Sequence, residues 1–223
     1  MKLYSGPLSM FGAKAEIAAH EKGLAFELVM VPFEMKTLYQ PKHPEVQRIN
    51  PKRQVPVLID GDLEIFDSTQ IFEYLESIKP EPALWPTEPK ARARARLLEH
   101  KSDEVYFPPI VRLMGLQGTP DDPAAAEARA AALSFYDGME KAIADKEWLV
   151  GSYTYADIAF YMAQIFGDRM GAPMTDAHPK LQAWRDRMSA RPAVRQVASA
   201  MGRYLLSQGR KLPAFLAKLT TSP

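Results

Sequence analysis

Hydrophobic and polar positions follow two different rhythms along this chain of 223 residues. In the first third, short apolar runs are bounded by glycine, proline and aspartate, which is the pattern of strands joined by turns. In the rest, apolar residues recur every three or four positions, which indicates helices. We therefore expect strands at Lys2–Ser5, Phe26–Pro32, Val57–Ile59 and Leu63–Phe66, and a first helix over Met10–Lys22.

The segment from Asn50 to Leu75 combines several local signals. Pro56 stands directly before an apolar run, at a position where a strand needs no backbone donor. Asp60-Gly61 is a tight-turn pair between two extended runs, so the two runs are expected to form a hairpin. Asp67-Ser68 is a helix-capping pair, and the apolar residues after it recur at helical spacing. The segment predicts strand, turn, strand and capped helix.

Residues 1–78 together predict the order βαβ-loop-ββα. Because βαβ crossovers are right-handed, the first two strands are expected to lie parallel. The stretch Phe33–Arg48 contains Pro41 and Pro44 and predicts a loop with at most a short helix. This order is the thioredoxin-like arrangement, a small mixed sheet with helices on both faces.

Residues 79–89 contain four prolines and predict a stiff linker, since proline fits neither a helix interior nor a central strand. Residues 90–223 then predict an all-α domain. Its helices are expected over Lys90–Leu116 with a bend or break at Pro108-Pro109, from Asp122 to about Asp145, from Thr154 to about Gly167, over Leu181–Ala190, over Pro192–Ser207, and after Leu212.

Composition narrows the possible functions. The 28 basic and 27 acidic residues nearly cancel, which argues against nucleic acid or an anionic membrane as the main partner. Cysteine is absent, so a protein thiolate, a disulfide and a thiolate-bound metal are all excluded. The four histidines show no metal-ligand spacing, so no metal site is expected. The first residues lack the apolar core of a signal peptide, and we expect a cytoplasmic protein.

The chain resembles the cytosolic glutathione S-transferases. The resemblance is carried by Gln54-Val55-Pro56, by the Asp60-Gly61 turn and by Asp67-Ser68, which stand together at the spacing of that family. A small α/β domain followed by an all-α domain is also the plan of that family, so the resemblance covers essentially the whole chain. It implies glutathione as cosubstrate, a small apolar electrophile, a role in detoxification and a homodimer.

The site also needs a residue that activates the thiol of glutathione. A thiol with a pKa of about 8.5 is mostly protonated at neutral pH, and a hydroxyl at a helix N-terminus can stabilise its thiolate. Ser9 lies where the first strand meets the first helix, and the sequence around it is similar to the serine-type transferases, especially the phi class. We therefore expect Ser9 to be the catalytic residue. Ser5 is an alternative, and Tyr4 is expected in the core.

The remaining glutathione contacts are implied by the resemblance. Val55 would pair its backbone with the cysteinyl unit beside a cis bond to Pro56, and Asp67 and Ser68 would hold the γ-glutamyl group. Gln54 and Lys42 are the candidates for the glycyl carboxylate. The histidine that usually precedes this lysine in the phi class is Pro41 here, and His43 is displaced, so the position of Lys42 departs from the pattern.

Two further predictions concern the helices. The electrophile site is expected to be apolar, to lie between the domains, and to be lined by Met10, Phe11, Tyr106, Ile110 and Met114. Thr154 and Asp157 form a capping-box pair that resembles the one on the central helix of the transferases, where it serves folding.

Three functions fit these residues. The first is conjugation of the glutathione thiolate to an apolar electrophile. The second is a specialised glutathione-dependent dehalogenase or isomerase that uses the same bound thiolate. The third is a non-catalytic binding or regulatory protein with the transferase fold, for which an intact Ser9, Asp67 and Ser68 would have no use.

Overall fold

A computed structural model of the chain describes residues 1–221. Two compact units make up the chain: one comprises Met1–Ala83 with the segment from Pro192 onward, and the other comprises Leu84–Arg191. We call them the sheet unit and the helical unit. This division by packing differs from the sequential domain boundaries expected at residues 78 and 90, because a helix near the end of the chain packs on the first helix and the last helix packs on that one. No helix within the described residues is long and apolar enough to cross a membrane.

The sheet unit contains the expected mixed sheet. Within residues 1–221 its four strands stand in the order β2-β1-β3-β4, with β1 and β2 parallel and the other neighbours antiparallel. The thioredoxin-like prediction and the parallel first pair are confirmed. The strands are β1 Lys2–Ser5, β2 Glu27–Met30, β3 Val57–Asp60 and β4 Leu63–Phe66.

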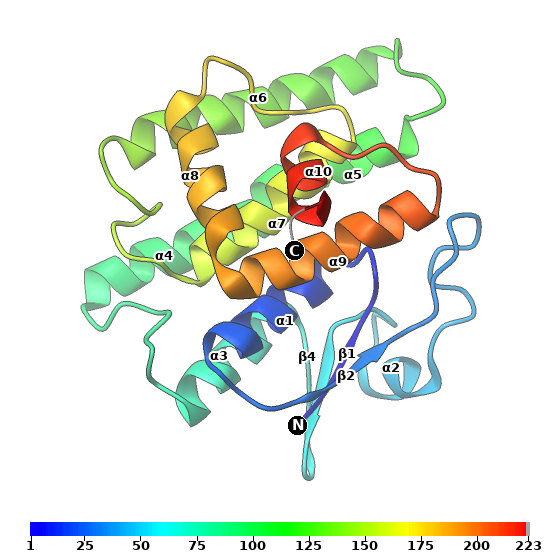
Figure 1. The fold of residues 1–223 in the computed structure, drawn as a ribbon, viewed down its shortest axis with the longest axis vertical. Helices are drawn as coiled ribbons and strands as arrows, with labels where there is room; N and C mark the ends of the chain where they lie inside the picture. The colour runs from blue at the N-terminus through cyan, green and yellow to red at the C-terminus, as the bar shows by residue number, and fades with distance from the viewer. Residues whose placement is uncertain (222–223) are drawn as a thin grey trace. The chain divides into compact units, whose positions relative to one another are not determined.

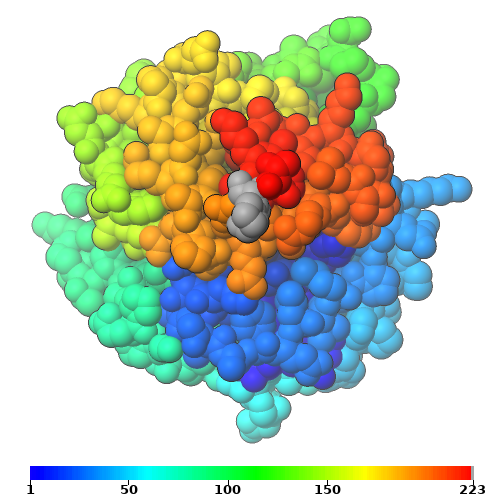
Figure 2. All heavy atoms as spheres, viewed as in Figure 1, coloured from blue at the N-terminus to red at the C-terminus, as the bar shows by residue number. Residues whose placement is uncertain are grey.

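Five helices pack around this sheet, and two of them come from the last part of the described chain. Figures 1 and 2 show the orange helix α9 lying against the blue N-terminal residues and the red α10 beyond it, in agreement with the packing of α9 on α1 and of α10 on α9. The helices of the unit are α1 Met10–Glu21, α2 Pro44–Ile49, α3 Ser68–Ile78, α9 Pro192–Ser207 and α10 Ala214–Thr221.

The close approach of α1 to β1 is made possible by a glycine. A Cβ on Gly12 would lie 2.3 Å from Ser5 Oγ, so no larger residue fits at this position without displacing Ser5. The hydroxyl of Ser5 donates a hydrogen bond to Glu16 one turn further along α1. Ser5 and Glu16 are both buried, and burial raises the pKa of Glu16 to about 7, although the hydrogen bond from Ser5 opposes the rise.

A buried lysine ties the other end of α1 to the proline-rich segment. Lys22 is 1% exposed, and its Nζ lies 2.5 Å from Glu76 Oε2 of α3. The same ammonium donates to the carbonyls of Pro80 and Pro82 at 3.2 and 2.7 Å. An isolated buried charge is costly, so the ammonium of Lys22 has to keep these partners. The two proline carbonyls among them therefore hold the segment after α3 against the sheet unit.

The all-α character expected of residues 90–223 is confirmed over residues 90–221, although only the helices before Pro192 belong to the helical unit. The expected break at Pro108-Pro109 is a single π-helical turn just before the prolines, and α4, this turn and α5 follow one another directly. A π-helical turn accommodates the ring of a following proline and its missing backbone N–H without ending the helix. The elements are α4 Pro89–Lys101, η1 Ser102–Tyr106, α5 Phe107–Gly115, α6 Pro123–Ile143, α7 Tyr155–Arg169 and α8 Pro179–Ala190.

The capping box predicted at Thr154 and Asp157 is present at the start of α7. Asp157 is fully buried, and its two oxygens accept four hydrogen bonds, two from the amide and hydroxyl of Thr154, one from the amide of Leu149 and one from Trp184 Nε1. Burial raises the pKa of Asp157 to about 6, and these donors oppose the rise. One carboxylate therefore joins α7, α8 and the loop before α7.

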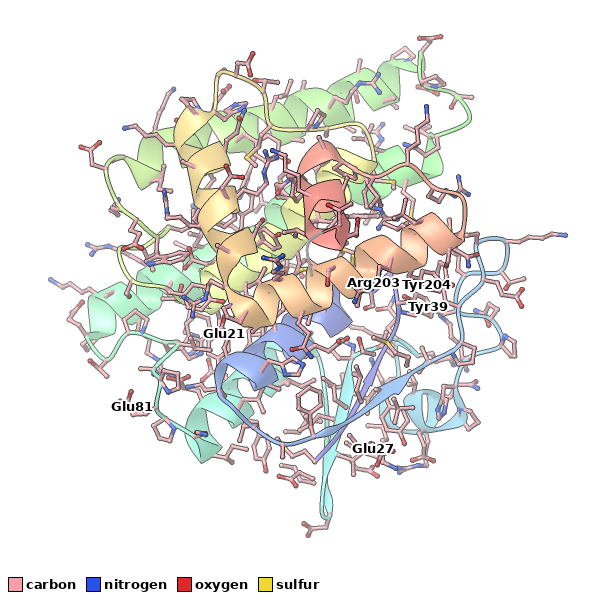
Figure 3. All side chains as sticks on the ribbon, viewed as in Figure 1. Glu21, Glu27, Tyr39, Glu81, Arg203 and Tyr204 are labelled. Carbon is pink, nitrogen blue, oxygen red and sulfur yellow. The ribbon has the colours of Figure 1, made fainter. Side chains whose placement is uncertain are left out.

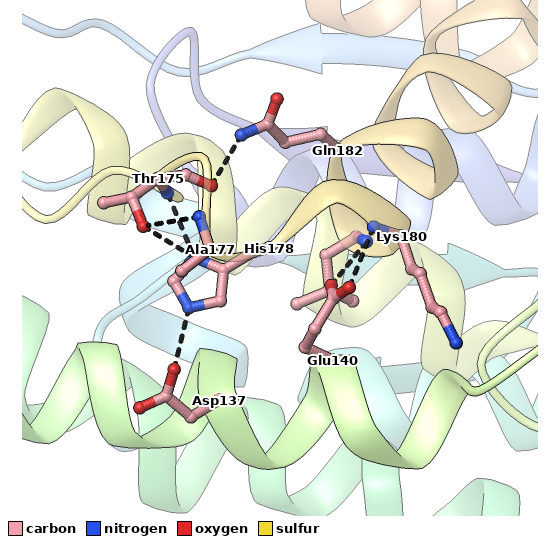
Figure 4. A network of polar contacts seen from close by, with 8 residues as sticks. Asp137, Glu140, Thr175, Ala177, His178, Lys180 and Gln182 are labelled. Carbon is pink, nitrogen blue, oxygen red and sulfur yellow. Dashed lines mark hydrogen bonds and ion pairs between the residues drawn. The ribbon is translucent and has the colours of Figure 1, made fainter.

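A second polar cluster fastens the loop before α8 to α6 (Figure 4). His178 is buried, and its Nδ1 accepts from the amide of Thr175 at 3.0 Å, so Nε2 carries the proton and donates to Asp137 at 3.1 Å. Glu140 of α6 accepts from the backbone amides of Lys180 and Leu181, both at 2.9 Å. Glu140 thus caps α8 from outside that helix.

Replacing Asp157 with Asn should destabilise the protein by about 3 kcal/mol, because an amide nitrogen would face buried donors that now reach a carboxylate. Urea denaturation measures the loss. Asp122→Asn is the matched control, since Asp122 caps α6 by accepting from Ala124 alone and Asn caps equally well. Equal stability of the two variants would contradict the role given to Asp157.

Replacing Glu16 with Gln should make stability less sensitive to pH. The folded pKa of about 7 lies above the ordinary value of 4.5, so this carboxyl stabilises the fold below pH 4.5 and that contribution is lost as pH rises through 7. Urea denaturation of wild type and Glu16→Gln at pH 5 and pH 8 should show the variant gaining about 2 kcal/mol relative to wild type at the higher pH.

Gln at position 16 keeps an oxygen to accept the hydrogen bond from Ser5. Glu21→Gln makes the same change near the end of the same helix, at a partly exposed position, and is the control. Parallel curves for wild type and Glu16→Gln across this pH range would show that Glu16 does not titrate there.

Candidate functional site

The sheet register brings three predicted site segments to one end of the sheet. Val57, the first residue of β3, lies opposite Tyr4 of β1 on one side and Phe66 of β4 on the other. The residues after β1, before β3 and after β4 therefore emerge at the same edge. These residues include Ser9, Gln54, Val55, Pro56, Asp67 and Ser68.

Ser9 is the N-cap of α1, as predicted. Its Oγ accepts from the amide of Gly12 at 3.0 Å, and its own amide donates to the carbonyl of Gly6 at 3.0 Å. Ser9 is only partly buried, and within residues 1–221 its hydroxyl proton has no acceptor. A hydroxyl in this state can donate to an anion placed at the helix N-terminus, where the helix dipole also favours negative charge.

The two competitors of Ser9 lie in the core. Ser5 is 0% exposed, and its hydroxyl already donates to Glu16. Tyr4 is 6% exposed and packs against Val31, Val46 and Val57, as expected for a core residue. Ser5 is therefore committed to Glu16 and Tyr4 to core packing, whereas the hydroxyl of Ser9 is partly exposed and has a proton to donate.

The turn before β3 is organised by Asn50. Its Nδ2 donates to the carbonyl of Gln54 at 2.6 Å, and its Oδ1 accepts from the amide of Lys52 at 2.9 Å. The peptide bond from Val55 to Pro56 is cis, as the resemblance implies. Within residues 1–221 the backbone N–H and C=O of Val55 have no hydrogen-bond partner, so they can pair with an extended peptide.

Asp67 and Ser68 start α3. Asp67 has a φ of 78°, and its carboxylate accepts from the amides of Thr69 and Gln70 at 3.0 and 3.4 Å. The carboxylate remains exposed, whereas Ser68 is 3% exposed. The exposed carboxylate of Asp67 can bind an ammonium, and the amide and hydroxyl of Ser68 at the helix N-terminus suit a carboxylate. One end of a γ-glutamyl unit carries both of these groups.

Lys42 lies on the loop that follows β2. Its Nζ is 5.8 Å from the centre of the Tyr39 ring. The next residue, His43, is the N-cap of α2, because its Nδ1 accepts from the amide of Glu45 at 3.3 Å. The ring of His43 also packs against the ring of Tyr4, with 5.1 Å between their centres, so His43 serves the fold. Lys42 therefore stays the candidate cation of this segment for the glycyl carboxylate.

The predicted electrophile residues have different environments. Met10 is 4% exposed in α1 of the sheet unit, and Phe11 is partly buried beside Lys14. Tyr106 and Ile110 are 0% exposed in the helical unit, and Tyr106 packs against Tyr136 and Phe160. Met114 is 42% exposed. The contacts of Tyr106 are those of a core residue, and the role of these five residues stays a prediction.

Two residues at this end of the sheet unit were not identified from the sequence. Glu16 is a buried acid in contact with Ser5, and Tyr39 contacts the segment between β1 and α1. A glutamate inside an apolar helix face and a tyrosine in a loop carry no motif that would single them out. Among the residues that the structure describes, no cluster of histidine and acidic side chains could hold a metal ion.

Comparison with known proteins agrees with this geometry. The family models "Glutathione S-transferase, N-terminal domain" and "Glutathione S-transferase, C-terminal domain" match residues 3–83 and 99–192. Glutathione S-transferase 3 of Zea mays is 30% identical over 212 residues, which cover 90% of this chain and 94% of the maize protein. A stringent starvation protein A homolog of Coxiella burnetii is 35% identical over 109 residues, which span only 48% of either chain.

Solved structures show the same relationship. A glutathione S-transferase from Rhodospirillum rubrum superimposes with a TM-score of 0.79 at 28% identity and covers 98% of this chain and 99% of its own. FzlA from C. crescentus has a TM-score of 0.82 at 23% identity over 98% of both chains, which shows a shared fold. With both family domains matched and a maize relative aligned along nearly its whole length, the chain belongs to the glutathione S-transferase family.

Proposed function

We propose that this protein is a glutathione transferase in which Ser9 stabilises the thiolate of glutathione. The observation that carries the proposal is the hydroxyl of Ser9, which accepts from Gly12 and keeps its own proton free at the N-terminus of α1. The proton of the bound thiol leaves to solvent. The thiolate then accepts the hydrogen bond from Ser9 and attacks the electrophile. In a substitution the electrophile loses its leaving group, and in an addition to a double bond the second carbon takes a proton from solvent.

Glutathione binding rests on the segments that the sheet register gathers. Val55 offers its free backbone N–H and C=O to the cysteinyl unit. Asp67 takes the ammonium of the γ-glutamyl group, and the amide and hydroxyl of Ser68 at the start of α3 take its carboxylate. Lys42 and Gln54 take the glycyl carboxylate. A related transferase from Methylobacterium radiotolerans, 29% identical with a TM-score of 0.72, was solved in complex with glutathione sulfonate.

A second candidate function is a non-catalytic binding or regulatory role. The observation that favours it is the 35% identity to the stringent starvation protein A homolog of Coxiella burnetii, which exceeds the 30% identity to the maize transferase. That match spans 48% of the relative, whereas the transferase match spans 94%. A dehalogenase or isomerase would use the same bound thiolate and differs only in the electrophile.

We also propose that the protein is cytoplasmic, since the cytoplasm keeps glutathione in the thiol form. We further propose that it is a homodimer. An open groove of about 730 Å³ runs between α4, η1 and α6 of the helical unit, with Leu98, Phe135 and Met139 in its lining. Val105 lies at this groove and is 54% exposed. Arg94, Lys101 and Lys146 also line the groove, but most of its exposed area is apolar, which suits a second copy of the chain.

Ser9→Ala should raise the pKa of the bound thiol by about one unit and lower kcat by about tenfold at pH 6.5, with glutathione affinity within about threefold of wild type. Asp67→Asn should lower glutathione affinity by about tenfold or more and leave the thiol pKa unchanged, because it removes a charge but keeps the cap on α3. Calorimetry, thiolate absorbance and conjugation of a chloronitroarene provide the three readouts.

Ser77→Ala is the matched control for Ser9→Ala, because it removes an exposed hydroxyl that donates to the Glu73 carbonyl on α3 of the same unit and should leave the thiol pKa unchanged. The opposite assignment of effects to positions 9 and 67 would overturn the proposed roles. Glutathione binding by the wild type without turnover of any electrophile would favour the regulatory candidate.

Val105→Glu should convert the dimer to a monomer, since it places a charge in the apolar groove surface. Light scattering after size exclusion gives the mass. Val111→Glu on α5 is the control, because Val111 is 43% exposed and does not line the groove. A dimer that survives Val105→Glu would place the interface elsewhere.

A further inference from the structure

Tyr39 holds the segment that connects β1 to α1. Its hydroxyl accepts from the amide of Leu8 at 3.3 Å. Its ring occupies the space beside Gly6, where an added Cβ would lie 2.4 Å from the ring carbon Cε1. Gly6 and Leu8 belong to the turn that Ser9 closes with its bond to the Gly6 carbonyl. Tyr39 therefore contacts the turn that presents Ser9 at both its start and its middle.

Helix α9 of the sheet unit fixes the loop that carries Tyr39. The Tyr204 hydroxyl of α9 donates to the carbonyl of Phe33 at 2.9 Å, and the two rings lie 6.1 Å apart. Phe33 in turn meets Tyr39 edge to face at 4.6 Å. Figure 3 shows Tyr39 and Tyr204 next to each other at the end of α9. Phe33, Tyr39 and Tyr204 form an aromatic clamp between α9 and the turn before α1.

The clamp matters because the direction of a hydroxyl proton depends on the backbone that carries it. Within residues 1–221 the hydrogen bonds of Ser9 are all local: its Oγ accepts from Gly12, its carbonyl accepts from Ala13, and its amide donates to Gly6. The amide of Leu8 is the remaining donor in the turn with a partner outside this segment. A shift of about 1 Å in a catalytic group can cost up to about a hundredfold in rate.

We propose that Tyr39 is a positioning residue for thiol activation, which aims Ser9 through its contacts with Gly6 and Leu8 and is itself anchored by Tyr204. The inference rests on the proposed function and deepens it. It makes α9 part of the activating machinery without contact to glutathione. The clamp lies entirely within the sheet unit.

The test uses the full chain with Tyr39→Phe, which removes the acceptor for the Leu8 amide and keeps the ring. The pKa of the bound thiol should rise by about half a unit to one unit, and kcat at pH 6.5 should fall by about three- to tenfold. Affinity for S-methylglutathione, which has no thiol to ionise, should stay within about twofold of wild type. Amide exchange at Leu8 should accelerate by about tenfold.

Tyr74→Phe is the matched control, since Tyr74 donates to Asp60 at 2.6 Å elsewhere in the same unit. It should change neither the thiol pKa nor the exchange of Leu8. The double variant Ser9→Ala with Tyr39→Phe should show no further rise in thiol pKa beyond Ser9→Ala alone, because Tyr39 acts through Ser9. Tyr204→Phe should reproduce the effect of Tyr39→Phe in weaker form.

A thiol pKa in Tyr39→Phe equal to that of Tyr74→Phe overturns the inference while leaving the proposed function intact. Additive effects in the double variant overturn it as well, because Tyr39 would then act on the thiol directly. A wild type that binds no glutathione ends the proposed function, and the inference falls with it even if Leu8 exchange responds to Tyr39→Phe.

Discussion

The contact between α1 and the end of β1 is the constraint on which the rest of the candidate site depends. Because residue 12 is glycine, the helix approaches until Ser5 fills the space that a Cβ would take, and Glu16 accepts the hydroxyl of Ser5 beneath it. This approach fixes where α1 begins, and so where Ser9 stands. The buried hydroxyl of Ser5 is already engaged in this contact, whereas the hydroxyl of Ser9 still has a proton to donate to a ligand.

Binding and activation are carried by different elements of one unit. The turn before β3 and the start of α3 offer backbone groups and a carboxylate suited to a tripeptide, whereas α1 offers a hydroxyl and a helix dipole suited to a thiolate. The strand register, with Val57 opposite both Tyr4 and Phe66, holds these elements at one edge. Mutations can therefore separate affinity from reactivity.

Local chemistry explains what the sequence could predict. Short-range signals predicted the hairpin, the helix caps and the capping box, because each depends on neighbours a few residues away. The structure contains all of them, with Ser9, Asp67 and Thr154 as caps and Asp157 completing the capping box. The contact of Tyr39 with Leu8 spans 31 positions of the sequence, and that of Tyr204 with Phe33 spans 171 positions. No local sequence pattern records contacts of this length. The π-helical turn before Pro108 was expected only as a bend, since proline signals an interruption but not its form.

Proton release on glutathione binding tests the central claim most directly. If Ser9 and the N-terminus of α1 stabilise the thiolate, binding at pH 7 should release close to one proton, because a thiol with a pKa of about 8.5 is protonated in solution at that pH. Calorimetry in buffers of different ionisation enthalpy measures this number, and S-methylglutathione should release none. Glutathione binding without proton release would contradict the account.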